Sequence, residues 1–218
     1  MRRDIDSFHY VSDFGVAEQN PATLFTITVY TKGDNMEMLK ITYTYVDNDE
    51  KLYQALDSVE GTGAIGVDTE TTGLDPLIDR LMLLQLAVSH HHALVIDIGK
   101  LGPEAMEKLK AVLQSDRVKV LQNAKFDLKF LKMAGLEVKG PVFDTMLAAQ
   151  IIHNGQAYQG SSLAALAEQY LGISLDKTEQ KSDWSRGLTE SQLKYAARDA
   201  AVLLPFRESL IAKSREVQ

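Results

Sequence analysis

Four carboxylates and one phenol occur in three separate segments of the chain, and their types and spacing could hold metal ions. Asp68 and Glu70 stand in G-V-D-T-E-T, Asp127 ends Q-N-A-K-F-D, and Tyr195 and Asp199 stand in Y-A-A-R-D. Carboxylate oxygens are hard ligands that suit divalent cations such as Mg²⁺ and Mn²⁺. Two such cations held close together can clamp a phosphodiester and activate a water against it. The pattern therefore predicts hydrolysis at the end of a nucleic acid.

Within each segment, the spacing brings the reactive side chains onto one face. Residues two apart on a strand point the same way, so Asp68 and Glu70 project together from the end of a predicted strand. Tyr195 and Asp199 are one helical turn apart and reach the same place from a helix. Asp127 shares its helical face with apolar residues, and a buried carboxylate needs a partner. A metal ion would be such a partner; a nearby lysine or backbone amides would be another.

The composition limits the class of protein. The chain has 218 residues, 45% of them hydrophobic, which suits one domain with an appended segment. It has no cysteine, so thiolate metal sites are excluded and any metal must bind oxygen or imidazole. A net charge of −7 argues against a protein that tracks duplex DNA by long-range attraction. The one notable positive bias is six basic residues between Arg117 and Lys139, which either guide a strand or form an ordinary solvated helix face.

Neither a membrane segment nor a secretory signal is expected. No apolar run approaches the length of about 18 residues that a transmembrane helix needs. Met1, Arg2 and Arg3 are followed by acidic residues rather than by an apolar stretch. We therefore expect a cytoplasmic protein with no membrane partner.

The segments that must position the reactive residues alternate between strand and helix patterns. The first two strands read as a hairpin, and a mixed central sheet flanked by helices, an α/β fold, follows from the order of the elements. Asp144 is expected to cap a helix, and Pro205 to bend or end the last one. Strands are expected at residues 24–30, 39–46, 64–68, 81–88, 93–98 and 118–121. Helices are expected at residues 49–59, 103–114, 124–134, 143–153, 162–171 and 189–213.

Together the three motifs resemble those of the DEDDy 3′–5′ exonucleases, which include the proofreading domain of family A DNA polymerases and the ribonuclease D group. D-T-E-T-T-G-L-D begins at Asp68, and the motifs that end at Asp127 and Asp199 follow in the family's order. A single D-x-E means little, whereas the joint context is specific. Tyr195 indicates the tyrosine branch, because the histidine branch would carry histidine at the position of Lys194.

The resemblance spans roughly residues 40–213 and implies an RNase H-like (DnaQ-like) exonuclease fold. On this basis we expect an exonuclease domain over residues 38–215. We expect residues 1–37 to form an N-terminal extension with an added strand.

The resemblance also implies two divalent cations, Mg²⁺ or Mn²⁺, and a role for each site residue. Asp68, Glu70 and Asp199 should hold the first cation, and Asp68 should share the second with Asp127, which acts through water. Tyr195 should position the attacking water. A free tyrosine has a pKa of about 10 and stays protonated at neutral pH, whereas a metal ion can lower the pKa of a water to about 7. We therefore expect the phenol to aim the water rather than deprotonate it.

Five further positions match family residues that contact substrate. Leu74 resembles the wedge that enters between the last two bases. A structural role competes at two of the others, since Phe126 suits a core and Asn123 suits a helix cap. The remaining positions should meet the terminal sugar or the flanking nucleotides: Thr71, Gln122, Asn123 and Phe126.

The expected activity is two-metal-ion 3′–5′ hydrolysis of single-stranded nucleic acid, which releases nucleoside 5′-monophosphates. The stretch D-T-E-T-T-G-L-D-P looks more like the proofreading domains, so a DNA 3′ end is favoured, with a polymerase as a further partner if the sequence is an excised domain. Trimming of RNA 3′ ends, as in ribonuclease D, is the alternative. Two other classes stay open: a non-catalytic nucleic-acid-binding module, and an RNase H-like endonuclease, which should lack the Y-x-x-x-D pairing.

Overall fold

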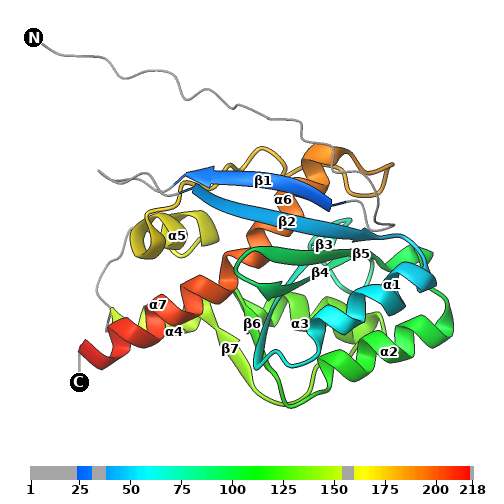
Figure 1. The fold of residues 1–218 in the computed structure, drawn as a ribbon, viewed down its shortest axis with the longest axis horizontal. Helices are drawn as coiled ribbons and strands as arrows, with labels where there is room; N and C mark the ends of the chain where they lie inside the picture. Colours follow the sequence, from blue (N-terminus) through cyan, green and yellow to red (C-terminus); the bar gives the residue numbers. More distant parts are fainter. Residues whose placement is uncertain (1–23, 31–37, 154–159, 217–218) are drawn as a thin grey trace, which may run out of the picture.

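A seven-stranded mixed sheet forms the centre of the computed structural model, which describes residues 24–30, 38–153 and 160–216 (Figure 1). Its strand order is β1-β2-β5-β4-β3-β6-β7, so the predicted mixed α/β architecture is confirmed. The predicted hairpin is also found, since β1 (Leu24–Tyr30) and β2 (Met38–Val46) pair antiparallel; its turn lies outside the described residues. The other strands are β3 (Ala64–Thr71), β4 (Leu81–Ser89), β5 (His92–Asp97), β6 (Val118–Leu121) and β7 (Val142–Asp144).

β3 lies inside the sheet, and this fixes the residues at its end. It pairs antiparallel with β4 on one side and parallel with β6 on the other. Ile65 and Val67 are buried on one face, so Asp68 and Glu70 lie on the opposite face. The β3–β4 register shifts between Glu70 and Thr71, and such irregularities re-aim side chains at strand ends.

Helices cover both faces of the sheet (Figure 1). The first face packs against three helices, whose apolar residues form one cluster with Ile65 and Val67. The second face packs against α6, whose alanines cluster with Leu83, Val95 and Tyr43 of the sheet. The first set comprises α1 (Asp49–Leu56), α2 (Pro103–Leu113) and α3 (Ala124–Met133). The later helices are α4 (Thr145–Ile152), α5 (Leu163–Leu171), α6 (Glu190–Ala201) and α7 (Leu203–Glu216).

A close approach between β3 and α6 brings their reactive residues together. A side chain at Gly66 would meet the carbonyl oxygen of Ala200 at 2.7 Å and the Ala87 Cβ at 2.9 Å. Only glycine therefore leaves room for the α6 backbone at this point. Gly66 precedes Asp68 by two residues, and Ala200 follows Asp199 directly, so the contact sets the two aspartates near each other.

The structure corrects two boundaries of the predicted helices. Helix was expected from residue 143, but Val142–Asp144 forms β7, which pairs parallel with β6, and α4 begins only at Thr145. The first helix ends at Leu56, and a short 3₁₀ turn, η1 (Asp57–Val59), follows. A second such turn, η2, covers Ile98–Lys100.

The long C-terminal helix breaks as expected. α6 ends at Ala201 and α7 begins at Leu203, two residues before Pro205. Proline lacks an amide hydrogen, and its ring clashes with the carbonyl four residues earlier, which here belongs to Ala201. The break therefore falls where the geometry of proline requires it.

The N-terminal part supplies one edge of the sheet. β1 is the outermost strand beside β2. The division of the chain into an extension over residues 1–37 and a domain over residues 38–215 stays a prediction. None of the helices in the described part of the chain is long and apolar enough to cross a membrane.

Candidate active site

The first two acids of the candidate site lie at the end of β3, as the sequence predicts. Asp68 and Glu70 are both half-buried and point to the face of the sheet that α6 covers. In the register with β4, Asp68 lies opposite Gln85. Both side-chain amide atoms of Gln85 are buried and lack a hydrogen-bond partner within the described residues. Because residues directly opposite each other on neighbouring strands share a face of the sheet, Gln85 lies beside Asp68, and the sequence analysis did not identify it.

α6 supplies Tyr195 and Asp199 to the same face. The helix begins with a capping box in which Thr189 and Gln192 bond each other's backbone amides, and this fixes its first turn. Its buried alanines let it lie close to the sheet. Asp199 is 9% exposed, and its carboxylate accepts a hydrogen bond from the Tyr195 hydroxyl. The predicted pairing of these two residues across one helical turn is therefore present.

Asp127 comes from the first turn of α3 and is 3% exposed. The Thr69 hydroxyl donates to its Oδ1 at 2.6 Å. Thr69 is thus the partner that a buried carboxylate requires, and the sequence analysis did not identify it. Strand alternation offered a signal, because Thr69 points away from Asp68 and Glu70 and toward the face on which α3 packs.

The acids interact strongly with one another. Burial, followed by the charges of Asp127 and Asp199, raises the pKa of Asp68 well above its ordinary range. Burial, followed by the charges of Asp68, Asp199 and Asp127, raises the pKa of Glu70 to about 10. Burial raises the pKa of Asp127 to about 7 even though the Thr69 hydrogen bond opposes the shift. The structure therefore brings all four predicted acids within electrostatic reach.

These acids fit hard divalent cations by their chemistry. All four offer oxygen donors, and burial raises the pKa of each, so a bound cation would favour their charged forms. As they stand, however, no three His, Asp or Glu side chains in the described part of the chain are arranged closely enough to hold a metal ion. Two of the acids are engaged elsewhere, Asp127 with Thr69 and Asp199 with Arg198.

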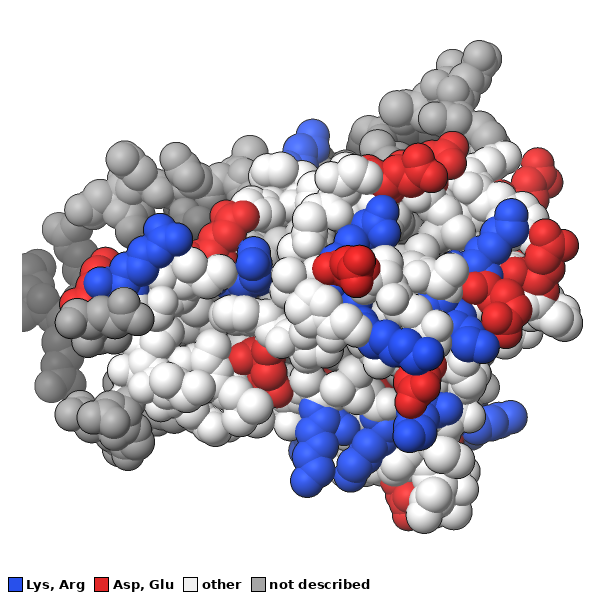
Figure 2. Space-filling view, turned by 90° about the horizontal axis from the view of Figure 1, so that it is seen from below, with Lys and Arg blue, Asp and Glu red and all other residues white. Residues whose placement is uncertain are grey.

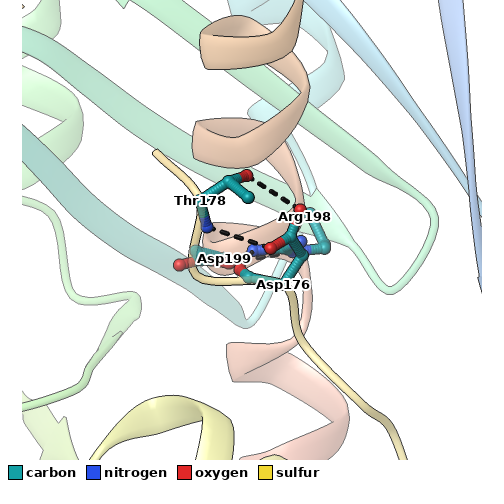
Figure 3. Close-up of polar contacts among 4 residues, drawn as sticks. All are labelled: Asp176, Thr178, Arg198 and Asp199. Carbon is teal, nitrogen blue, oxygen red and sulfur yellow. Dashed lines mark hydrogen bonds and ion pairs between the residues drawn. The ribbon is translucent and has the colours of Figure 1, made fainter. Parts of the chain in front are cut away.

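Arg198 is a site residue that the sequence analysis missed. It is 8% exposed, and its Nε and Nη2 donate to Oδ1 of Asp199 at 3.0 and 2.8 Å. Nη2 also donates to the carbonyl oxygen of Asp176 at 2.6 Å, while the Asp176 carboxylate accepts from the amide and hydroxyl of Thr178 (Figure 3). Burial raises the pKa of Asp199, and the Arg198 guanidinium opposes the shift. The sequence does contain a signal for Arg198, because an arginine among the alanines of a buried helix face needs a partner for its charge.

The Tyr195 phenol lies in a setting that keeps it protonated. Burial, then the charges of Asp199 and Glu70, raises the pKa of Tyr195 well above its ordinary value. Its ring centroid lies 6.3 Å from that of Trp184 and 4.9 Å from the Arg198 guanidinium carbon. Trp184 is buried and serves packing rather than an exposed stacking surface.

Three of the predicted substrate-contacting residues are accessible. Leu74 is 83% exposed in the loop after β3. Asn123 is exposed and has a φ of 57°, a left-handed conformation that asparagine tolerates better than most residues. Phe126 is half-buried, with its ring 5.0 Å from that of Phe130. Substrate contact by these residues stays a prediction.

The other two are already hydrogen-bonded within the protein. The Gln122 amide nitrogen donates to the carbonyl of Ser161 at 2.7 Å, and its oxygen accepts from the Thr145 hydroxyl. The Thr71 hydroxyl donates to the carbonyl of Gly73 at 2.6 Å. Both side chains are thus engaged within the protein, and their contact with substrate also stays a prediction.

Asp144 caps two helices at once. Its carboxylate accepts from the amides of Met146 and Leu147, which confirms the predicted cap of α4. It also accepts from the amides of Asn123 and Ala124 at the start of α3. The alternative in which the Asn123 side chain caps α3 is wrong, because that side chain makes no cap hydrogen bond.

An open groove of about 700 Å³ runs between α3 and α4. Its lining includes the exposed apolar residues Leu147 and Ile151, and Lys125, Lys129 and Lys132 line its α3 side. Figure 2 views the underside of the molecule and shows lysine and arginine side chains grouped beside a largely uncharged area. Half of the six basic residues noted in the sequence therefore lie together on α3, the helix that carries Asp127.

Comparison with curated sequences gives this geometry a context. A family model described as 3′–5′ exonuclease matches residues 43–214. DNA polymerase I of Aquifex aeolicus is 36% identical over 162 residues, which are 74% of this chain and 26% of the polymerase. Ribonuclease D of Escherichia coli is 33% identical over 175 residues, which are 79% of this chain and 45% of the ribonuclease. The chain thus spans less than half the length of these relatives.

Solved structures show the same fold. Escherichia coli RNase D, described as an exoribonuclease involved in structured RNA processing, has a TM-score of 0.71 at 30% identity, over 80% of this chain and 45% of that one. Brucella melitensis NrnC bound to pGG has a TM-score of 0.67 at 28% identity, over 80% of this chain and 81% of that one. NrnC has also been solved with bound Mg²⁺. These likenesses confirm the predicted RNase H-like fold.

Proposed function

Because this chain belongs to the 3′–5′ exonuclease family, we propose that it trims single-stranded RNA from the 3′ end and releases nucleoside 5′-monophosphates. The family makes it a nuclease that hydrolyses phosphodiester bonds. The observation that carries the proposal is the convergence of Asp68, Glu70, Asp127 and Asp199 from β3, α3 and α6 beside the Tyr195 phenol. A non-catalytic binding module would not need all four acids, so their presence favours an enzyme.

The choice of RNA over DNA rests on the comparisons. The sequence motifs favour DNA, but the likeness to ribonuclease D covers more of this chain than the likeness to DNA polymerase I does. A solved ribonuclease D also shares the fold at 30% identity. Both support the RNA alternative more than the DNA preference. Trimming of DNA 3′ ends remains the second candidate, because DNA polymerase I is 36% identical to this chain.

We propose Mg²⁺ or Mn²⁺ as the cofactors, held by Asp68, Glu70, Asp127 and Asp199. When bound, such cations would neutralise the carboxylates, polarise the scissile phosphodiester and favour ionisation of a water. The all-oxygen donor set and the Mg²⁺ bound by the related NrnC support this choice. Cleavage would join the water oxygen to phosphorus and break the bond between phosphorus and the 3′ oxygen of the preceding nucleotide.

The chain's own residues would orient the reaction. The Tyr195 hydroxyl donates a hydrogen bond to Asp199, so its oxygen can still accept a hydrogen bond from the attacking water. Its raised pKa makes it a positioning group rather than a base. Leu74, exposed beside the end of β3, would part the last two bases, and Asn123 would meet the terminal sugar. The lysines along α3 would hold phosphates further from the 3′ end.

A time course on matched RNA and DNA oligonucleotides tests the proposal. Each strand carries a 5′ label and is incubated with Mg²⁺ or Mn²⁺ and, as a control, with EDTA. We expect the RNA ladder to shorten in single steps faster than the DNA ladder, and no shortening in EDTA. Faster shortening of DNA would favour the second candidate, and no shortening of either strand would contradict both.

A further inference from the structure

Arg198 joins a predicted metal ligand to a part of the chain that lies outside the metal site. Two of its nitrogens donate to the same oxygen of Asp199, Oδ1, at 3.0 and 2.8 Å. They do not form the usual fork onto both carboxylate oxygens. The pairing therefore occupies Oδ1 and leaves Oδ2 without a bond to the guanidinium. Adjacent residues on a helix do not face each other, so Arg198 must fold back to make this contact.

The same guanidinium holds the α5–α6 connection, which we define as residues 173–189. Nη2 donates to the Asp176 carbonyl at 2.6 Å, and Thr178 closes a turn on the Asp176 carboxylate. Figure 3 shows Arg198 and Asp199 on α6 beside the Asp176–Thr178 turn of this connection. Arg198 thus contacts the metal ligand and the connection with one rigid group.

Further along, the α5–α6 connection packs against Tyr195. Trp184 is buried, and its ring centroid lies 6.3 Å from that of Tyr195. The Arg198 guanidinium lies over the same Tyr195 ring, with its carbon 4.9 Å from the ring centroid. The Gln192 amide of α6 donates to Ser182 at 2.9 Å and to the Asp183 carbonyl at 3.2 Å. A change in the position of Arg198 would therefore reach Trp184 by two routes, through the Tyr195 ring and through the α5–α6 connection.

We propose that Arg198 is a positioning residue that couples cation binding at Asp199 to the placement of the α5–α6 connection and of Tyr195. The inference rests on the proposed function, because it takes Asp199 to be a metal ligand. A cation at Asp199 meets the fixed positive charge of Arg198, which weakens the pair on Oδ1. The guanidinium then shifts, and the connection shifts with it. Arg198 consequently lowers the affinity for the cation and transmits cation binding to the α5–α6 connection and to Tyr195.

Trp184 provides a direct readout, because it is the only tryptophan in the chain. EDTA-treated wild-type protein, Arg198→Met and Arg198→Lys are titrated with Mg²⁺ in the absence of nucleic acid, by calorimetry and by tryptophan fluorescence. In the wild type we expect a saturable change of Trp184 fluorescence. In Arg198→Met we expect about tenfold tighter Mg²⁺ binding, because a nearby like charge is removed, and loss of the fluorescence change.

The conservative variant separates charge from geometry. Arg198→Lys keeps the charge but lacks the planar fork, so we expect Mg²⁺ affinity close to wild type with at least half of the fluorescence change lost. If Arg198→Met does not fold, Arg198→Lys alone decides the question, and a fluorescence change in Arg198→Lys equal to that of the wild type overturns the inference. Lys194→Met is the matched control, since Lys194 is on the same helix but pairs with Glu190. It should leave the fluorescence change intact.

The outcomes distinguish this inference from the proposed function. Wild-type affinity and a wild-type fluorescence change in Arg198→Met, in a protein that still trims RNA, overturn the inference alone. Failure of the wild type to bind either Mg²⁺ or Mn²⁺ overturns the proposed function and this inference with it.

Discussion

Tyr195 is held on three sides by residues of different chemistry. Its hydroxyl donates to Asp199, Trp184 packs against its ring, and the Arg198 guanidinium lies 4.9 Å from the ring centroid. These contacts fix the direction of the phenol, and burial together with nearby carboxylates raises its pKa. A group that is fixed and protonated suits the orientation of a water, not the removal of its proton.

Tyr195→Phe tests this role. Single-turnover cleavage should fall on the order of 100-fold, the typical loss when one positioned hydrogen-bonding group is removed. Mg²⁺ affinity should stay close to wild type, because phenylalanine leaves the four acids in place. The slope of the rate against pH between about pH 7 and about pH 9 should be the same in both proteins, since the phenol does not titrate there. If the rate of the wild type rises with pH over this range and the rate of the variant does not, Tyr195 acts as a base instead.

At the scale of helices and strands, Asp144 fixes the two elements that border the groove. Its carboxylate accepts amide hydrogens from the first turns of both α3 and α4, and α3 carries Asp127. Ser162 makes the simpler comparison, because its hydroxyl accepts only from the Ala165 amide at the start of α5. Asp144 therefore caps two helices, whereas Ser162 caps one.

Removal of these caps should cost stability in proportion to the helices they serve. Asp144→Ala should lower the free energy of unfolding by about 2 kcal/mol, and Ser162→Ala by about 1 kcal/mol. Asp144→Ala should also reduce cleavage, because a frayed α3 misplaces Asp127. Urea unfolding measures both variants on one scale. Equal losses for the two variants would mean that Asp144 does not stabilise both helices.

Local patterns in the sequence predicted most of the elements, since each depends on neighbouring residues. Apolar periodicity located the strands and helices, and Pro205 located the break between α6 and α7. β7 was missed because three residues are too few to show a period, and its pairing with β6 is set by contacts distant in sequence. Helix was therefore assigned to Phe143 and Asp144 in error.

The same distinction separates the site residues that sequence predicted from those it missed. Asp68, Glu70, Asp127, Tyr195 and Asp199 carry recognisable motifs, and the structure brings them within electrostatic reach of one another. The contacts of Thr69 and Arg198 were missed although one partner of Arg198, Asp199, is its neighbour in the chain. The other partners are remote: Asp127 lies 58 residues from Thr69, and Asp176 lies 22 residues from Arg198. Local patterns indicate that both side chains point to buried faces and need partners, but they do not identify partners that are distant in sequence.

At the scale of the whole molecule, the site collects negative charge that the folded chain must tolerate. Burial and neighbouring acids raise the pKa of Glu70 from 4.5 to about 10, and burial raises the pKa of Asp127 from 3.8 to about 7. The folded protein without cations thus binds more protons than the unfolded chain. The resulting stabilisation is complete below the ordinary pKa values and is lost as pH rises through about 7 for Asp127 and about 10 for Glu70.

In EDTA, the free energy of unfolding should therefore be lower at about pH 8.5 than at about pH 6. Glu70→Gln mimics the protonated acid, so in EDTA at the higher pH it should be more stable than the wild type, although inactive. Mg²⁺ should stabilise the wild type more than the variant. Urea unfolding at both pH values measures these differences. A wild type that is more stable at the higher pH in EDTA would contradict the charge coupling.

The groove along α3 gives the molecule a cationic strip despite its net charge of −7. If Lys129 and Lys132 each neutralise a phosphate, their joint replacement by glutamine should weaken binding of single-stranded RNA in EDTA. It should also reduce the slope of log affinity against log salt by about 0.7 per lysine. Lys108→Gln with Lys110→Gln on α2 makes the same change of charge away from the groove. Equal effects of the two double variants would exclude the groove as the path of the strand.

The central claim is that the four-acid site hydrolyses a strand from its 3′ end, and matched linear and circular RNA test it most directly. With Mg²⁺, the wild type should shorten 5′-labelled linear RNA in single-nucleotide steps and leave the circle intact, because a circle has no 3′ end. Asp68→Asn, which keeps the shape of the side chain but removes its charge, should leave both uncut. Cleavage of the circle by the wild type, or wild-type trimming by Asp68→Asn, would contradict the account.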